Sequence, residues 1–130
     1  MIIATCWVLL LTIAPLYLLY GLYAAVMNFK RAKDAGKLSK AGLALGYPYF
    51  AIGMLLDVYC NTIPLSIILW EYPQWFVMDG WKMTIGRMEL TVSQRVTRHS
   101  QFGGWRGDVA RWFCEDLLNS LDPSGLHCKP

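Results

Sequence analysis

Residues 1–27 read MIIATCWVLLLTIAPLYLLYGLYAAVM and contain no charged side chain. A helix needs about 20 apolar residues to cross a hydrocarbon core of ~30 Å, so this stretch is long enough to span a bilayer. Pro15 lies within it, and in lipid a proline is expected to kink such a helix without ending it. We therefore predict a first transmembrane span over residues 2–27.

A second apolar stretch, residues 41–70, reads AGLALGYPYFAIGMLLDVYCNTIPLSIILW and carries one formal charge, Asp57. Thirty helical residues would extend about 45 Å, which is more than a bilayer core requires. Pro64 offers a natural division. The sequence thus predicts a second span over residues 43–61 and an apolar, aromatic segment over 62–78 that lies at the membrane interface or re-enters it. Residues 1–70 would form a transmembrane hairpin.

The composition argues against a water-soluble domain. Hydrophobic residues make up 55% of the 130 residues and charged ones 16%, against roughly 25% charged in ordinary soluble domains. A secretory signal peptide would have a basic segment before a short apolar core, and here no Lys or Arg precedes a run that is also too long. The net charge of +3 is too small to indicate a nucleic-acid partner.

Residues 28–40 form a basic segment, with five Lys or Arg against the single acid Asp34. Short loops rich in Lys and Arg stay on the cytoplasmic side of a membrane. We therefore expect a membrane protein of two spans, with the basic loop cytoplasmic and both termini facing the periplasm or the exterior. Five arginines between Arg87 and Arg111 reduce the contrast between the two sides.

Residues 79–130 differ in character and are predicted to form an extramembrane helical tail. Asp79-Gly80 is a turn signal. The alternating residues after it are compatible with a hairpin turning at Gly86-Arg87. Alternatively, Thr91 caps a helix and Gln94 completes a capping box, which favours a helix over residues 92–99. Residues 101–104 form a flexible break.

A second tail helix is predicted from Trp105 to Leu121, because its apolar residues recur at helical spacing along one face. Asp122-Pro123-Ser124-Gly125 would end it in a tight turn. The partner of the apolar stripe is left open by the sequence: it could dock on the hairpin, lie on the lipid surface, or bind another protein. The stripe residues singled out as candidate partner-binding residues are Trp105, Val109, Trp112, Phe113 and Leu117.

Several short runs over roughly the second half of the chain form a recognisable pattern: Asp57 with Asn61-Thr62, residues 90–95 (LTVSQR), Gly104-Trp105-Arg106, residues 110–114 (ARWFC), Leu117-Leu118 and residues 122–128 (DPSGLHC). This pattern resembles a group of small membrane proteins encoded by tailed bacteriophages and prophages. The resemblance implies a phage or prophage setting in a bacterial inner membrane, with both termini periplasmic if the basic loop is cytoplasmic, and it implies no activity or functional residue.

Asp57 is the most informative single residue of the spans, because a charged side chain at the centre of a membrane helix costs roughly 2.5–3.5 kcal/mol. Asn61 lies one turn further on the same face and is positioned to hydrogen-bond to it. One interpretation is an intramembrane polar seam for oligomerisation or a water path. The other is that Asp57 lies near the helix end and reaches the headgroups.

The cysteines and histidines of the tail allow two further interpretations. If the tail is periplasmic, Cys114 and Cys128 are candidates for a disulfide that staples the final turn to the helix; otherwise they are free thiols that behave as small apolar residues. Cys114, Cys128, His99 and His127 do not have the spacing of a known zinc site. We expect no metal, no cofactor and no catalytic residue.

Small residues on both spans would permit close helix packing, either within the hairpin or between copies as a homo-oligomer. They are Gly21, Ala24 and Ala25 on the first span, and Gly42, Gly46 and Gly53 on the second.

Two functional hypotheses follow for this mainly α protein, a two-span hairpin with an interfacial aromatic segment and a small amphipathic tail. The first is a non-catalytic protein whose tail helix binds a membrane or envelope protein. The second is a holin-like permeabiliser that oligomerises through its spans.

Overall fold

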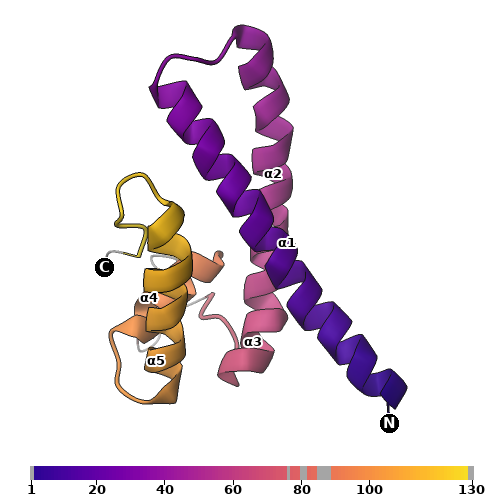
Figure 1. The fold of residues 1–130 in the computed structure, drawn as a ribbon. Coiled ribbons are helices and arrows are strands. Elements are labelled where there is room, and N and C mark those ends of the chain that lie inside the picture. The colour runs from indigo at the N-terminus through magenta and orange to yellow at the C-terminus, as the bar shows by residue number, and fades with distance from the viewer. Residues whose placement is uncertain (1, 76, 80–81, 85–88, 129–130) are drawn as a thin grey trace.

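A computed structural model describes residues 2–75, 77–79, 82–84 and 89–128. Two long helices form an antiparallel hairpin, and three shorter helical elements of the tail pack along one flank of it (Figure 1). The fold is mainly helical, as predicted. Two of its helical stretches, Trp7–Asp34 and Lys40–Leu69, are long and apolar enough to cross a membrane.

The first helix, α1 (Ile2–Asp34), is longer than the predicted span 2–27. Pro15 is accommodated inside it. The helix continues through Lys30, Arg31 and Lys33, because these side chains are good helix formers and do not end a helix. The predicted basic loop 28–40 was therefore wrong in extent: the connection is residues 35–39, where Gly36 has the positive φ of 67° that glycine tolerates best.

The second apolar stretch forms α2 (Lys40–Thr62) and α3 (Pro64–Leu69), separated only at Ile63. Ser39 caps α2 by accepting a hydrogen bond from the backbone N–H of Gly42. Pro64 takes the first position of α3, where its missing N–H is not needed. The helices divide next to Pro64, and residues 64–69 of the predicted segment 62–78 are helical. The position of this segment at the membrane interface stays a prediction.

Two short strands follow the hairpin. β1 (Val77–Asp79) pairs antiparallel with β2 (Lys82–Thr84), and Asp79 lies opposite Lys82. The predicted turn signal at Asp79 thus falls at the end of β1. The alternative turn at residues 86–87 lies outside the described residues.

The tail helices begin and end close to where the sequence placed them. α4 (Val92–Ser100) starts with the predicted capping box, in which Thr91 and Gln94 satisfy each other's backbone N–H groups. α5 (Trp105–Trp112) runs directly into the π-helical element η1 (Phe113–Asn119). Gly107 permits α5 to start close to the preceding loop, because a Cβ there would approach the carbonyl oxygen of Phe102 to 2.0 Å.

The core lies between the hairpin and the tail. Cys60, Leu65 and Leu69 supply its hairpin side. The tail side is Val92 and Val96 from α4, Ala110 from α5 and Cys114 from η1. Because the best-buried residues belong to both parts, the tail packs against the second apolar helix and does not have a separate core of its own.

The tail lies beside the hairpin and runs along it. Arg106, at the start of α5, donates from Nε to the carbonyl oxygen of Leu69 at 2.7 Å, at the far end of α3. At the other end of the tail, Arg31 of α1 donates to the carbonyl oxygen of Leu121 at 2.7 Å. The hairpin tip, residues 34–40, extends beyond the tail (Figure 1).

Candidate functional site

Asp57 of α2 is a cap for the first tail helix. Its Oδ1 accepts a hydrogen bond from the backbone N–H of Val92 at 2.8 Å, and Val92 is the first residue of α4. The first N–H groups of a helix have no partner inside the helix and carry the positive end of its dipole. A carboxylate within an apolar helix therefore has a local partner, and that partner belongs to the tail.

Asn61 lies one turn further along α2 and binds the segment just before α4. Its Nδ2 donates to the carbonyl oxygen of Glu89 at 2.6 Å, and the side chain is fully buried. The predicted hydrogen bond between Asp57 and Asn61 is not formed among the described residues, since each side chain binds the tail instead. Asn61 Oδ1 has no hydrogen-bond partner within the described part of the chain.

Arg95 of α4 is fully buried against the end of the hairpin. Its Nη1 donates to the carbonyl oxygen of Asn61 at 2.7 Å and to Ser66 Oγ at 3.1 Å, and its Nη2 donates to the carbonyl oxygen of Glu71. The carbonyl of Asn61 belongs to the last turn of α2, where the helix dipole favours a cation, and Glu71 follows α3. The guanidinium thus fixes the tail on the end of α2 and on the segment after α3.

Arg98, one turn after Arg95, forms an ion-pair cluster with two glutamates from outside the tail helices. It contacts Glu71 Oε1 at 2.5 Å and pairs through Nε with Glu89. Burial alone would raise the pKa of Glu71, but the hydrogen bond and charge of Arg98 hold it below its usual range. Burial likewise opposes the charge of Arg98, and the two glutamates raise the pKa of its guanidinium.

His99 is buried beside this cluster, with Nε2 3.6 Å from Glu71 Oε1 and 3.2 Å from Arg98 Nη2. Burial lowers the pKa of His99 below 6.5, and the charge of Arg98 lowers it further, while Glu71 opposes the shift. The imidazole is therefore held in its neutral form at neutral pH.

The predicted partner-binding stripe is divided between the core and the surface. Val109, Phe113 and Leu117 are half-buried, and the first two pack against the core. Trp105 and Trp112 remain exposed at 53% and 51%. Docking on the hairpin, one of the three interpretations left open by the sequence, accounts for the buried part of the stripe.

An apolar groove lies between α1 and part of the stripe. It has a volume of about 410 Å³ and only a small polar part. Tyr17 and Tyr20 line it from α1, while Trp112, Phe113 and Leu117 line it from the tail. The volume is within the range of about 300–1,000 Å³ typical of ligand pockets.

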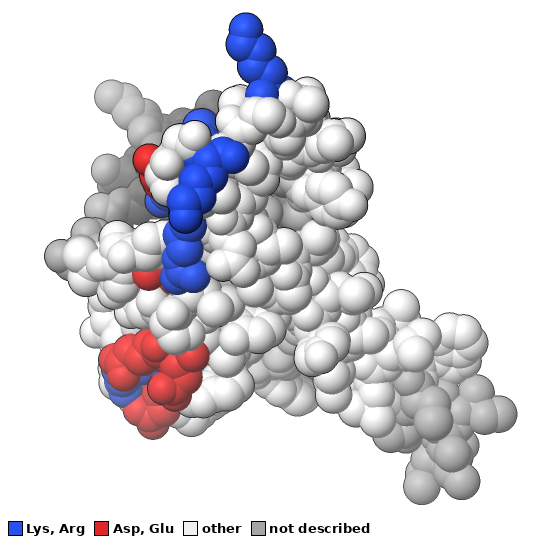
Figure 2. Space-filling view, turned by 45° about the horizontal axis from the view of Figure 1, so that its top comes forward, with Lys and Arg blue, Asp and Glu red and all other residues white. Residues whose placement is uncertain are grey.

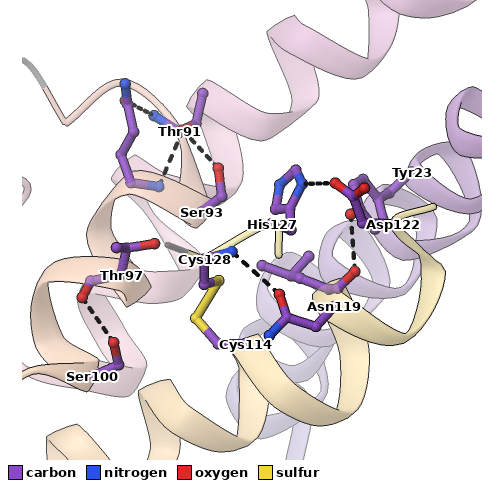
Figure 3. The surroundings of a disulfide bond; sticks show 12 residues. Tyr23, Thr91, Ser93, Thr97, Ser100, Cys114, Asn119, Asp122, His127 and Cys128 are labelled. Carbon is purple, nitrogen blue, oxygen red and sulfur yellow. Dashed lines mark hydrogen bonds and ion pairs between the residues drawn. A yellow bond between two sulfur atoms is a disulfide. The ribbon is translucent and has the colours of Figure 1, made fainter. Parts of the chain in front are cut away.

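Cys114 and Cys128 form a disulfide, with Cα atoms 5.6 Å apart (Figure 3). The backbone N–H of Cys128 donates to Asn119 Oδ1 at 3.2 Å, which also ties the end of the described chain to η1. Both cysteines are therefore unavailable as zinc thiolates. Among the described residues, no three His, Cys, Asp or Glu side chains are grouped to hold a metal ion.

The turn between these cysteines is built around Asp122. Its Oδ1 accepts from the backbone N–H of Ser124 at 2.8 Å, and its Oδ2 lies 3.0 Å from His127 Nδ1 (Figure 3). Burial would raise the pKa of Asp122, but these hydrogen bonds and the charge of His127 lower it to about 2. The His127 ring packs edge-on against Tyr23 of α1, with centroids 5.0 Å apart. The final turn is thus anchored to the hairpin.

The sequence did not identify Arg95, Arg98 or Glu71 as site residues, because evenly mixed charges in the tail favoured a solvated surface. A signal was nevertheless present. Val92, Arg95, Val96 and His99 follow the i, i+3, i+4, i+7 spacing of one helix face, and all four are buried. A polar residue in such a pattern indicates a buried hydrogen-bonding role.

Comparison of the chain with protein-family models, curated proteins and solved structures gives no match.

Proposed function

We propose that this protein is a small non-catalytic integral membrane protein that acts by binding another membrane or envelope protein. Large apolar side chains are exposed along α1 and α2, among them Leu10, Leu18, Leu45 and Leu55. In water these surfaces would be a severe liability, whereas lipid accepts them. In Figure 2 the described part of the α1 arm that projects from the body is white, without the blue or red of charged side chains.

The observation that supports the interaction function best is the groove between α1 and the tail. Trp112 lies at this groove with half of its surface exposed, opposite Tyr17, which is 78% exposed. Exposed aromatic anchors beside an apolar groove are the usual centre of a protein interface. An amphipathic or transmembrane helix of a partner could place its apolar face here.

The rigid docking of the tail supports the same proposal. Asp57, Asn61 and Arg95 hold α4 on the hairpin. Tyr23 of α1 donates to the carbonyl oxygen of Leu118 in η1, which holds the element after Trp112 beside α1. A preorganised surface loses less entropy on binding than a mobile one. The tail would therefore serve as a fixed binding platform.

The compartment belongs to the proposal as well. Disulfides persist in oxidising compartments such as the bacterial periplasm, and Cys114 is disulfide-bonded. Basic residues at the hairpin tip favour the cytoplasm for that end. We infer an inner-membrane hairpin with a cytoplasmic tip and with the start of α5 on the periplasmic side. A phage or prophage origin remains a prediction from the resemblance described above.

The permeabiliser hypothesis is less well supported. In that hypothesis the spans oligomerise through their small-residue faces and Asp57, but Asp57 binds the tail of its own chain. The tail would have to leave the hairpin before Asp57 could contact a second copy.

Site-specific photocrosslinking in bacterial membranes tests the proposal. A photoreactive phenylalanine analogue at Trp112 or Tyr17 should give one discrete crosslinked product. The matched control position is Ile52, which is 55% exposed on α2 and lies outside this groove. Equal crosslinking from Ile52 and Trp112, or from neither, would contradict the proposal. A product of twice the chain mass would identify a second copy as the partner, and collapse of the membrane potential on expression would favour the permeabiliser.

A further inference from the structure

A second groove lies between α1 and α2 near the hairpin tip. Its volume is about 580 Å³, and it is lined by Val26 and Phe29 from α1 and by Tyr47 and Phe50 from α2. No tail residue is among the side chains that line it. The hairpin alone forms this groove, although Val26 and Phe50 also line a neighbouring pocket together with tail residues.

Gly46 determines the shape of this groove. A Cβ at Gly46 would lie 2.1 Å from ring atoms of Phe29, so only glycine lets the Phe29 ring lie directly on the α2 backbone. The small-residue position predicted for helix packing is thus used to seat an aromatic ring. Phe50, one turn further along α2, is 52% exposed beside it.

Positive charge is concentrated at one end of the groove. Lys30 and Lys33 line it from the last turns of α1, and both side chains are exposed. Asp34 is the single acid beside them. Lysine stems pack along apolar surface while the ammonium stays in a polar environment, so these two residues join an apolar groove to a cationic rim.

We propose that this groove binds an anionic phospholipid, with an acyl chain against Phe29 and Phe50 and the phosphate bound by Lys30 and Lys33. The apolar groove and the cationic rim match the two parts of such a lipid. Basic clusters next to membrane helices bind anionic headgroups of the cytoplasmic leaflet. This site is separate from the partner groove and rests only on the hairpin lying in a membrane.

Spin-labelled lipids test this proposal on the full chain in phosphatidylcholine bilayers. Electron paramagnetic resonance gives the protein's preference for labelled phosphatidylglycerol over labelled phosphatidylcholine. The double variant Lys30→Gln/Lys33→Gln should lower this preference about fivefold for each lysine removed. The matched control Lys37→Gln/Lys40→Gln removes the same charge from exposed positions outside the groove, and should retain most of the preference.

A third variant tests the role of the groove independently of the lysine charges. Ala25 is exposed and lines the groove, so Ala25→Phe fills it without changing the net charge. Ala25→Phe should lower the preference for phosphatidylglycerol, as the variant Lys30→Gln/Lys33→Gln does. Equal losses in the two lysine pairs, or an undiminished preference in Ala25→Phe, would show diffuse surface electrostatics and overturn the proposal. Displacement of the lipid by glycerol 3-phosphate would also overturn it, because the site would then recognise a phosphate alone.

Discussion

At the residue scale, Asp57 shows why an acidic side chain can be placed in an apolar helix. Its oxygen accepts from the first N–H of α4, where the helix dipole adds to the attraction. Arg95 provides the reverse pairing, a cation at the carbonyl end of α2. The two contacts bind opposite kinds of helix end, and together they fix the tail on the hairpin.

Replacing Asp57 should therefore loosen the tail. Asp57→Leu leaves the N–H of Val92 without its acceptor, and an unsatisfied buried group costs about 1–3 kcal/mol. We expect the free energy of unfolding to fall by this amount in detergent, measured by helical circular dichroism. Asp57→Asn keeps an acceptor oxygen and should lose less. Equal stability of Asp57→Leu and the wild type would contradict the capping role.

His99 should make the stability of the protein depend on pH near neutrality. Because its pKa is lowered in the folded chain, the unfolded chain binds more protons below pH 6.5. Stability should therefore fall as the pH decreases through 6.5 towards the folded pKa. Thermal unfolding followed at several pH values checks this, and His99→Gln should remove the dependence in this window. If the stability of His99→Gln depends on pH as strongly as that of the wild type, another group causes the dependence.

Asp122 contributes in a separate and more acidic window. Its folded pKa of about 2 lies below the ordinary 3.8, so its contribution is present above 3.8 and is lost as the pH falls towards 2. The two effects can be told apart by pH alone.

At the scale of elements, the sequence predicted most of the helices because their signals are local. The capping box at Thr91, the break before Trp105 and the proline at residue 64 all act within one helical turn. The extent of α1 was mispredicted because charge was taken to mark a loop. Lys30 and Lys33 continue the helix without interruption, since helix propensity does not depend on whether a side chain suits lipid.

The disulfide leads to a prediction about the final turn, which follows η1. It closes a segment with a sequence separation of 14 between Cys114 and Cys128, and closing a loop of about 15 residues stabilises a fold by roughly 3 kcal/mol. The double variant Cys114→Ser/Cys128→Ser should therefore expose the final turn to proteolysis at a lower temperature than the wild type.

Alkylation followed by mass measurement checks the bond itself. Without reduction, only the remaining thiols should react, and reduction should add two labelled sites. If Cys114 and Cys128 are labelled without reduction in protein purified from intact cells, both are free thiols. That outcome would argue against a periplasmic location of this part of the tail.

At the scale of the whole molecule, the docking of the tail was beyond prediction from the sequence. The contact between Asp57 and Val92 joins residues 35 positions apart, and that between Tyr23 and Leu118 joins residues 95 positions apart. No local pattern specifies such pairs. The apolar stripe could be recognised from its spacing, but its division into buried Phe113 and exposed Trp112 depends on the hairpin surface that it meets.

The side-on position of the tail also constrains how the molecule can sit in a bilayer. Asp108, Glu115 and Asp116 are exposed on the tail, and each charge would cost roughly 2.5–3.5 kcal/mol at the centre of a bilayer. We therefore expect this surface to face water or a polar protein surface, while the uncovered faces of α1 and α2 contact lipid.

The central claim is that the apolar hairpin crosses a membrane and places its tip and the start of α5 on opposite sides. Labelling of spheroplasts with a membrane-impermeant maleimide tests it, using Lys37→Cys and Asp108→Cys in a Cys6→Ser/Cys60→Ser background. Asp108→Cys should react in intact spheroplasts, and Lys37→Cys only after the membrane is opened. Reaction of both positions in intact spheroplasts, or recovery of the protein in the soluble fraction, would contradict the account.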